Sequence, residues 1–254
     1  MSRRVAAVAV TVLLLTVSGS TTHRTATLAH RPMPVAQLPP TSPPTTTQPL
    51  NVVATARVPS VGVWDSPGQG DAARRLDNPT KPYGTPLVFL VREQEPDWLR
   101  VLLPVRPNGS MGWIRRADVD MATHDYRIKV ELGAHRITVW KGNAIFDQEP
   151  IGVGTNDTPT PGGLYYTKEL LQPVDSRGRL IPDGPYGPYA YGLSGYSDVL
   201  YNFAGGDGVI GIHGTNDPTS VGQDVSHGCI RMTNDAITRL ATTLPIGVPV
   251  EIAR

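Results

Sequence analysis

The chain has 254 residues, with 26 glycines, 25 prolines and a formal net charge of +1. This length accommodates one large domain or two small ones, and the many turn-forming residues favour short strands and loops over a helical bundle. The small net charge excludes a chain-wide attraction to nucleic acid or to an anionic membrane, so we expect no nucleic-acid partner.

The first 30 residues have the pattern of a secretory signal. Arg3 and Arg4 precede an apolar run over residues 5–17, which is followed by small residues. A basic start, a short apolar run and small residues are typical of a signal peptide. The run is shorter than the ~20 residues of a membrane span, although residues 5–17 could still serve as an uncleaved anchor. We therefore expect export to the periplasm or cell wall, secreted or anchored.

Residues 31–50 are predicted to be a disordered linker. The stretch RPMPVAQLPPTSPPTTTQP contains seven prolines, and threonine, serine and glutamine dominate the rest. A segment of this composition has too little apolar surface to form a core and favours an extended, polyproline-like spacer.

Residues 51–120 have the pattern of a small β domain. Strands are predicted at 87–91, 98–103 and 111–114, and the last two flank Pro107-Asn108-Gly109, a hairpin turn signal. The segments VGVWDSPG and GWIRRADV resemble bacterial SH3-like modules, which implies a small β-barrel. Trp64, Trp98 and Trp113 could line a ligand groove, but packing in a small core is the favoured interpretation.

Residues 124–254 are predicted to form a second, mostly antiparallel β domain with one short helix. Apolar and polar residues alternate over 128–132, and residues 209–212 form a buried strand that ends at His213. Thr233 is expected to cap a helix that runs to about residue 243. The last strand, 248–252, contains Pro249, which favours an edge position.

The single cysteine, Cys229, lies in the segment SHGCIRM, and the segment IGIHGT precedes it. A lone thiol in an exported protein cannot form an intramolecular disulfide and is either inert or reactive. A nucleophilic cysteine needs a base within reach and donors for an oxyanion. His213 ends a different strand and can approach the thiol from across a sheet, whereas His227 is a poorly aimed sequence neighbour. We expect Cys229 to be partly thiolate near neutral pH.

Two other interpretations of these residues remain open. Cys229 could be a buried structural thiol, although the adjacent glycine and the absence of an apolar run disfavour this. His213, His227 and Cys229 could instead bind zinc, which requires three or four ligands. The other histidines of this region, His124 and His135, lie near its start, so a metal site is the least favoured interpretation.

The combination of HGT with SHGCIRM resembles the catalytic signature of the L,D-transpeptidases. The similarity extends over residues 125–252 and includes GVGTNDTPTPGG, YGPYAYGLSG and the closing IGVPVEI. The resemblance implies a β-rich catalytic domain that follows the SH3-like barrel, and acyl transfer through a cysteine thioester. It implies no metal or organic cofactor.

The resemblance also implies roles for individual residues. Cys229 matches the nucleophile and His213 the base, and the carbonyl of Gly214 would hold the imidazole tautomer. The backbone N–H groups of His227, Gly228 and Cys229 would form the oxyanion hole.

A second set of residues is expected to bind substrate. It comprises Ser226, His227, Arg231, Tyr189 and Tyr191. Arg231 could hold a substrate carboxylate in bidentate fashion, or it could be one half of a structural ion pair.

The implied substrates are peptidoglycan stem peptides, and carbapenem-type β-lactams are the implied inhibitors. Two alternative functions share most of these features. One is an L,D-carboxypeptidase or other hydrolase that uses the same residues with water as acceptor. The other is a non-catalytic wall-binding protein that depends on its SH3-like module.

Overall fold

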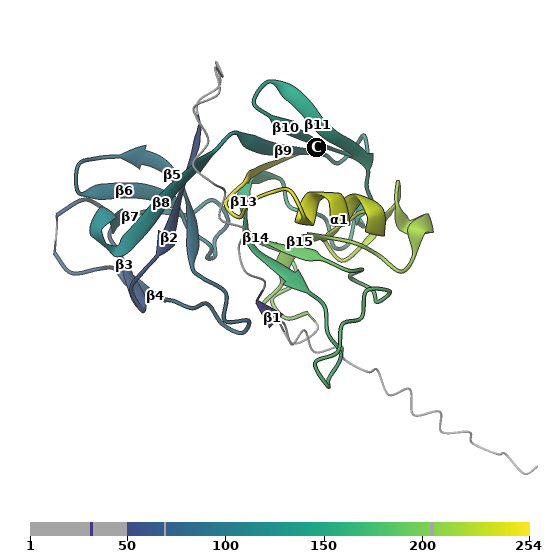
Figure 1. Cartoon of the computed structure of the whole chain (residues 1–254), viewed down its shortest axis with the longest axis horizontal. Coiled ribbons are helices and arrows are strands. Elements are labelled where there is room, and N and C mark those ends of the chain that lie inside the picture. Colours follow the sequence, from purple (N-terminus) through teal and green to yellow (C-terminus); the bar gives the residue numbers. More distant parts are fainter. Residues whose placement is uncertain (1–30, 33–49, 69, 204–205) are drawn as a thin grey trace, which may run out of the picture.

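The computed structural model describes residues 31–32, 50–68, 70–203 and 206–254 (Figure 1). This part of the chain is mainly β, with the α-helix α1 (Asn234–Ala241) and the 3-10 turns η1 (Arg116–Asp118) and η2 (Pro218–Ser220). The expected fold class, mainly β with one short helix, is confirmed at this level. The predicted signal segment, with the possible anchor at 5–17, lies outside the described residues. So does the predicted linker, apart from Arg31–Pro32 and Leu50.

The first sheet has the strand order β7-β6-β5-β2-β8. Its strands are β2 (Asn51–Ala56), β5 (Val88–Gln94), β6 (Trp98–Leu102), β7 (Met111–Arg115) and β8 (Val119–His124). Beside it lies the hairpin of β3 (Ser60–Val63) and β4 (Arg74–Asp77). The strands expected near 87–91, 98–103 and 111–114 are confirmed as β5, β6 and β7. Because β8 pairs with β2 along its whole length, this sheet continues past residue 120 to His124.

The first sheet has an apolar core of its own. Val61, Phe89, Leu99 and Ile114 are among its fully buried members. Trp64 is buried and packs edge-on against Trp98, with ring centroids 5.0 Å apart. Packing is therefore the role that the structure gives to Trp64.

The second sheet has the order β11-β10-β9-β18-β13-β14-β15-β17, and β1 (Arg31–Pro32) pairs with β13. Its other strands are β9 (Tyr126–Glu131), β10 (Arg136–Lys141), β11 (Ala144–Pro150), β13 (Gly163–Gln172), β14 (Ala190–Tyr196), β15 (Val209–His213), β17 (Ile230–Arg231) and β18 (Pro249–Ala253). A separate pair joins β12 (Val153–Gly154) to β16 (Asp224–Ser226). Because β1 lies in the sheet, two residues of the predicted linker are strand.

The second sheet is mostly antiparallel, as predicted, but two of its pairs are parallel: β15 with β17 and β18 with β9. The separate pair of β12 with β16 is parallel as well. The expected edge position of Pro249 is wrong, because β18 lies between β9 and β13. Pro249 is the first residue of its strand, where a proline is tolerated in the interior of a sheet.

The two sheets lie side by side and share buried contacts (Figure 1). Leu90 and Leu102 of the first sheet and Tyr166 of the second form one buried cluster. The Tyr166 hydroxyl donates to the carbonyl of Val88 at 2.8 Å, and the Thr85 hydroxyl donates to the buried Glu169 carboxylate at 3.0 Å. The buried Tyr166 and Glu169 thus each find a hydrogen-bond partner in the other half of the molecule.

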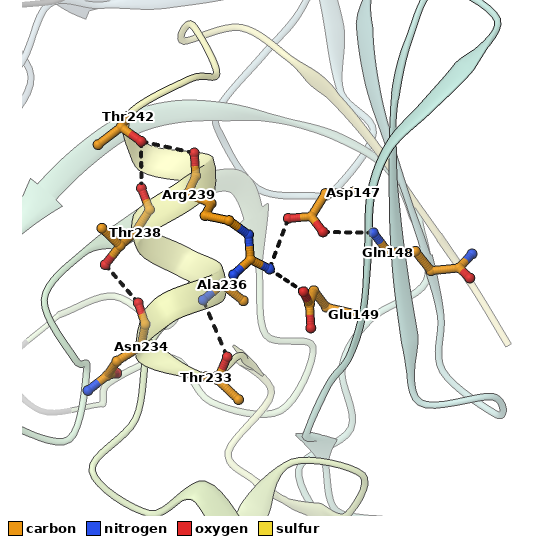
Figure 2. A network of polar contacts seen from close by, with 9 residues as sticks. All are labelled: Asp147, Gln148, Glu149, Thr233, Asn234, Ala236, Thr238, Arg239 and Thr242. Atoms are coloured by element: carbon orange, nitrogen blue, oxygen red, sulfur yellow. Dashed lines mark hydrogen bonds and ion pairs between the residues drawn. The ribbon is translucent and has the colours of Figure 1, made fainter.

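Helix α1 packs on the second sheet through Ala236, Ile237 and Leu240, which are buried. Figure 2 shows its polar side, where Arg239 pairs with Asp147 and Glu149 of β11. Thr233 is the N-cap, as predicted, and its hydroxyl accepts from the Ala236 N–H at 3.3 Å. No helix in the described residues is long and apolar enough to cross a membrane.

We expect Thr233→Ala to lower the free energy of unfolding by about 1 kcal/mol, because the helix loses the acceptor for one of its first N–H groups. Urea denaturation followed by circular dichroism measures this. Thr242→Ala is the matched control, since Thr242 lies at the other end of the helix and its hydroxyl bonds only to helix carbonyls. Equal losses in the two variants would contradict the capping role.

Candidate active site

The candidate site lies where β15 runs parallel to β17. Ile212 pairs with Ile230 and His213 with Arg231. One residue before β17, Cys229 lies next to Gly211, whose backbone forms a hydrogen bond with the thiol. Side chains two apart on a strand share a face, and in-register partners on parallel strands point the same way. His213, Arg231 and Cys229 therefore occupy one face of the sheet.

His213 is buried and held in one tautomer. Its Nδ1 lies 2.6 Å from the carbonyl oxygen of Gly214. Since a carbonyl only accepts, Nδ1 carries the proton and Nε2 keeps its lone pair. Burial lowers the pKa of His213 to about 4, and Arg231 lowers it as well, whereas the Gly214 bond raises it. At neutral pH the imidazole is therefore neutral and able to accept a proton at Nε2.

Cys229 is half-buried, and burial raises the pKa of its thiol. The hydrogen bond with Gly211 and the charge of Arg231 act in the opposite direction but are smaller. Burial therefore opposes the partial thiolate that was expected near neutral pH, because desolvation penalises the anion more than Arg231 stabilises it. Burial favours a thiol next to a neutral imidazole.

Tyr186 also belongs to the site, although the sequence analysis did not single it out. Its ring packs edge-on against His213 with centroids 4.8 Å apart. Burial and the neighbouring Cys229 raise the pKa of the Tyr186 hydroxyl, and Arg231 lowers it. The only sequence signal was its position at the start of YGPYAYGLSG.

Ser226 shapes the turn that precedes the cysteine. It is buried, its hydroxyl donates to the Cys229 carbonyl at 2.6 Å, and it accepts from the Gly228 N–H at 3.1 Å. Gly228 has φ +112°, a conformation that side chains with a Cβ rarely adopt. The Ser226 hydroxyl therefore stabilises the turn that precedes Cys229. Its predicted contact with substrate stays a prediction.

The Gly228 N–H requires a correction, because the sequence analysis assigned it to the oxyanion hole. The Ser226 hydroxyl accepts from this N–H, so the donor is not available to an oxyanion in this conformation. Within the described residues, the backbone N–H groups of His227 and Cys229 have no hydrogen-bond partner. These two donors remain from the predicted set.

His227 is exposed, whereas His213 is buried. Its ring stacks on Phe203 with centroids 4.9 Å apart and an interplanar angle of 31°. Phe203 belongs to the connection between β14 and β15, which the sequence analysis did not relate to the site. The structure therefore gives His227 an aromatic partner and leaves His213 as the imidazole of the cluster.

Arg231 is held by its backbone on both sides. Besides its pairing with β15, its N–H donates to Gly152 at 2.8 Å and its carbonyl accepts from Gly152 at 2.9 Å. Its Nε is buried and has no hydrogen-bond partner, and no carboxylate of the described residues forms an ion pair with it. Of the two interpretations of Arg231, the structural ion pair is therefore not found in the part of the chain that is described.

The two tyrosines predicted to bind substrate differ in position. Tyr189 is half-buried, and its carbonyl accepts from the Gly214 N–H at 3.3 Å. Tyr191 is 1% exposed, and its hydroxyl donates to the carbonyl of Leu240 at 3.0 Å. The prediction for Tyr191 is wrong: it is a core residue between β14 and α1.

Asn234 at the start of α1 braces the same region and was also missed. Its side-chain oxygen accepts from the Thr215 N–H at 2.9 Å (Figure 2 shows its place on the helix). A Cβ at Gly187 or Gly214 would lie 2.3 Å from this oxygen, so both positions require glycine. Asn234 therefore holds the backbone that carries the partner of His213 Nδ1.

A zinc site would need three or four ligand side chains close together. Among the described residues, no group of three or more His, Cys, Asp and Glu side chains is arranged to bind a metal ion.

The family model for the YkuD-type L,D-transpeptidase catalytic domain matches residues 125–252. YkuD of Bacillus subtilis, whose assignment as an L,D-transpeptidase is provisional, is 38% identical over 135 residues, which are 53% of this chain and 70% of that protein. Its counterpart in Bacillus licheniformis is 35% identical over 130 residues, which are 51% of this chain and 67% of that protein.

Solved structures resemble the chain less closely. An L,D-transpeptidase of Enterococcus faecium has 21% identity and a TM-score of 0.38, and covers 51% of this chain. The present chain spans half of that protein's length, 50%. An L,D-transpeptidase of Mycobacterium tuberculosis has 15% identity and a TM-score of 0.42, with 66% of this chain and 90% of that chain covered. The family assignment rests on the sequence matches: by these, the chain belongs to the L,D-transpeptidase family.

Proposed function

We propose that the protein is a peptidoglycan L,D-transpeptidase that works through a thioester on Cys229. One observation carries the proposal: a buried His213, whose Nδ1 donates to Gly214 so that the lone pair lies on Nε2, shares a face with the only thiol of the chain. Nucleophile, base and orienting carbonyl then follow the logic of a triad in which Gly214 supplies the third group.

In the first half-reaction, Cys229 Sγ attacks the carbonyl carbon of the third residue of a stem tetrapeptide. The thiol proton passes to His213 Nε2 as the S–C bond forms. Backbone N–H groups of His227 and Cys229 stabilise the oxyanion. Collapse breaks the peptide bond, and the leaving D-alanine amine takes the proton from His213. The acyl group remains on Cys229 as a thioester.

In the second half-reaction, an amine of another stem attacks the thioester and gives its proton to His213. Collapse expels the Cys229 thiolate, which takes the proton back, and a cross-link between stems is released. Water as acceptor would give the carboxypeptidase alternative with the same residues. The non-catalytic wall-binding alternative would leave the orientation of His213 without a function.

Arg231 would bind the terminal carboxylate of the stem peptide. Its guanidinium lies beside the thiol and the imidazole, and its buried Nε lacks a partner in the described structure. A buried donor without a partner costs free energy, which a ligand carboxylate can recover.

The rest of the chain would serve export and wall binding. Residues 51–120 would be an SH3-like module that assists wall binding, and residues 124–254 the catalytic domain. The N-terminal segment would direct export, since the proposed substrate lies outside the cytoplasm. Carbapenem-type β-lactams would acylate Cys229 as strained acyl donors. No metal or organic cofactor takes part in the proposed steps.

We expect Cys229→Ala to abolish both the acyl adduct and turnover, because the chain has no other thiol. His213→Ala should slow acylation by about 10²–10⁴-fold, the usual contribution of a general base. Mass spectrometry of the protein and products after incubation with a stem tetrapeptide, with and without an acceptor stem, measures both. His135→Ala is the matched control and should acylate at the wild-type rate, because the partly exposed His135 ring pairs with Asp224 and has no role in the proposed steps.

An adduct on another residue, or turnover in Cys229→Ala, would contradict the mechanism. Formation of free tripeptide only, even with excess acceptor amine, would support the hydrolase instead. A wild-type protein that binds wall fragments but forms no adduct would support the wall-binding alternative.

We expect Arg231→Gln to lower kcat/KM for the tetrapeptide by about 10- to 100-fold, the equivalent of one charge-assisted hydrogen bond. A tetrapeptide with an amidated C-terminus tests the partner: wild type should lose a similar factor, and Arg231→Gln should lose nothing further. Additive losses would mean that Arg231 does not bind that carboxylate.

Alkylation of Cys229 by iodoacetamide should accelerate only at alkaline pH, with a midpoint above the ordinary thiol value. The raised pKa has this sign because a weaker acid needs a higher pH to form the reactive thiolate. The alkylation rate measured from pH 5 to 10 tests it. A rate that has already levelled off at neutral pH would mean that the empty site holds a thiolate–imidazolium pair.

A further inference from the structure

The loop between β6 and β7, on the first sheet, contacts the connection between β14 and β15 on the second. Arg106 lies in this loop and donates to three backbone carbonyls of that connection: Ser197 at 2.7 Å, Leu200 at 3.0 Å and Asp207 at 3.0 Å. The first two acceptors precede Phe203 in the chain and the third follows it.

The same guanidinium also packs against two aromatic rings. Its carbon lies 4.9 Å from the ring centroid of Tyr196 and 4.4 Å from that of Tyr201. Five N–H donors in a planar fork, together with a face that stacks on rings, are properties of arginine that lysine lacks. Arg106 is thus matched to the backbone and side chains of a segment about 90 to 100 residues away.

A neighbour in the same loop makes the contact specific. The Asn108 side chain donates to the carbonyl of Tyr196 at 2.7 Å and accepts from its N–H at 2.9 Å. The Tyr196 hydroxyl in turn donates to the carbonyl of Pro104 at 2.7 Å. Paired donor and acceptor bonds of this kind define the register of the loop against the end of β14.

The segment that Arg106 holds reaches the candidate active site. Phe203 stacks on His227, two residues before Cys229, and the His227 N–H is one of the remaining oxyanion donors. Phe203 is itself 37% exposed, so its position depends on the segment that carries it more than on burial.

We propose that Arg106 is a positioning residue for the Cys229 site: from the first sheet it holds the segment that places Phe203 on His227. Arg106 itself lies outside residues 125–252, the range that the family model covers. The placement of Phe203 on His227 then depends on a residue from the first sheet. The kinetic consequence rests on the proposed function, whereas the structural consequence does not.

The test uses the full chain with Arg106→Met, Arg106→Lys, Phe203→Ala and the double variant Arg106→Met/Phe203→Ala. Arg100→Met is the matched control, because Arg100 is on β6 of the same sheet and its one ion pair within the described residues is with Glu93. Thermal melting checks folding. Phe203→Ala keeps the test valid if Arg106→Met is poorly folded, since Phe203 is on the surface.

For the structural readout, the side-chain NMR signals of His227 carry a ring-current shift from Phe203. The shift should disappear in Phe203→Ala and in Arg106→Met, decrease in Arg106→Lys and persist in Arg100→Met. Retention of the wild-type shift in a folded Arg106→Met would overturn the proposal, whatever the protein's activity.

For the kinetic readout, kcat/KM for acylation by the tetrapeptide should fall about 10- to 100-fold in Arg106→Met, as expected for a misplaced substrate contact. The rate of alkylation by iodoacetamide should not change, since the thiol and His213 are untouched. The double variant should lose no more than the larger single loss. Additive losses, or an equal fall in alkylation, would overturn the proposal. Failure of wild type to form any adduct would refute the proposed function, and the NMR readout would still decide the role of Arg106.

Discussion

The parallel pairing of β15 with β17 is the constraint on which the site depends. It sets His213 beside Arg231 and brings Cys229 onto the same face. A slip of one residue would turn one partner to the opposite face, because side chains alternate along a strand. The register is held by the buried pair Ile212–Ile230 and by the bond from Met232 N–H to the carbonyl of His213 at 2.8 Å.

Burial then determines the protonation of the pair. Desolvation raises the pKa of Cys229 and lowers that of His213, so both groups are held in their neutral forms. Arg231 lowers both pKa values, which favours the thiolate and disfavours the imidazolium. Burial of both groups therefore limits the reactivity of the thiol before substrate binds.

The positions of the strands, of the helix start and of the candidate histidine could be predicted from the sequence, because each depends on residues that are close together in the chain. Alternating apolar residues located the strands, and Thr233 located the start of α1. Spacing and residue chemistry predicted which histidine accompanies Cys229, since His213 ends a buried strand whereas His227 follows a turn. The bond of Gly214 to the imidazole has the same local origin, as the two residues are adjacent.

Other features were decided only by the tertiary structure. Tyr191 looked available to substrate, yet all seven residues of β14 are buried, and the Tyr191 hydroxyl bonds to a carbonyl of α1. Tyr186, Asn234 and Arg106 act on segments that lie far from them in the chain. The pKa of Cys229 depends on how deeply folding buries it. By itself the sequence located the candidate residues Cys229 and His213 and the elements that carry them. Burial and long-range contacts come from packing between distant segments, which no local pattern encodes.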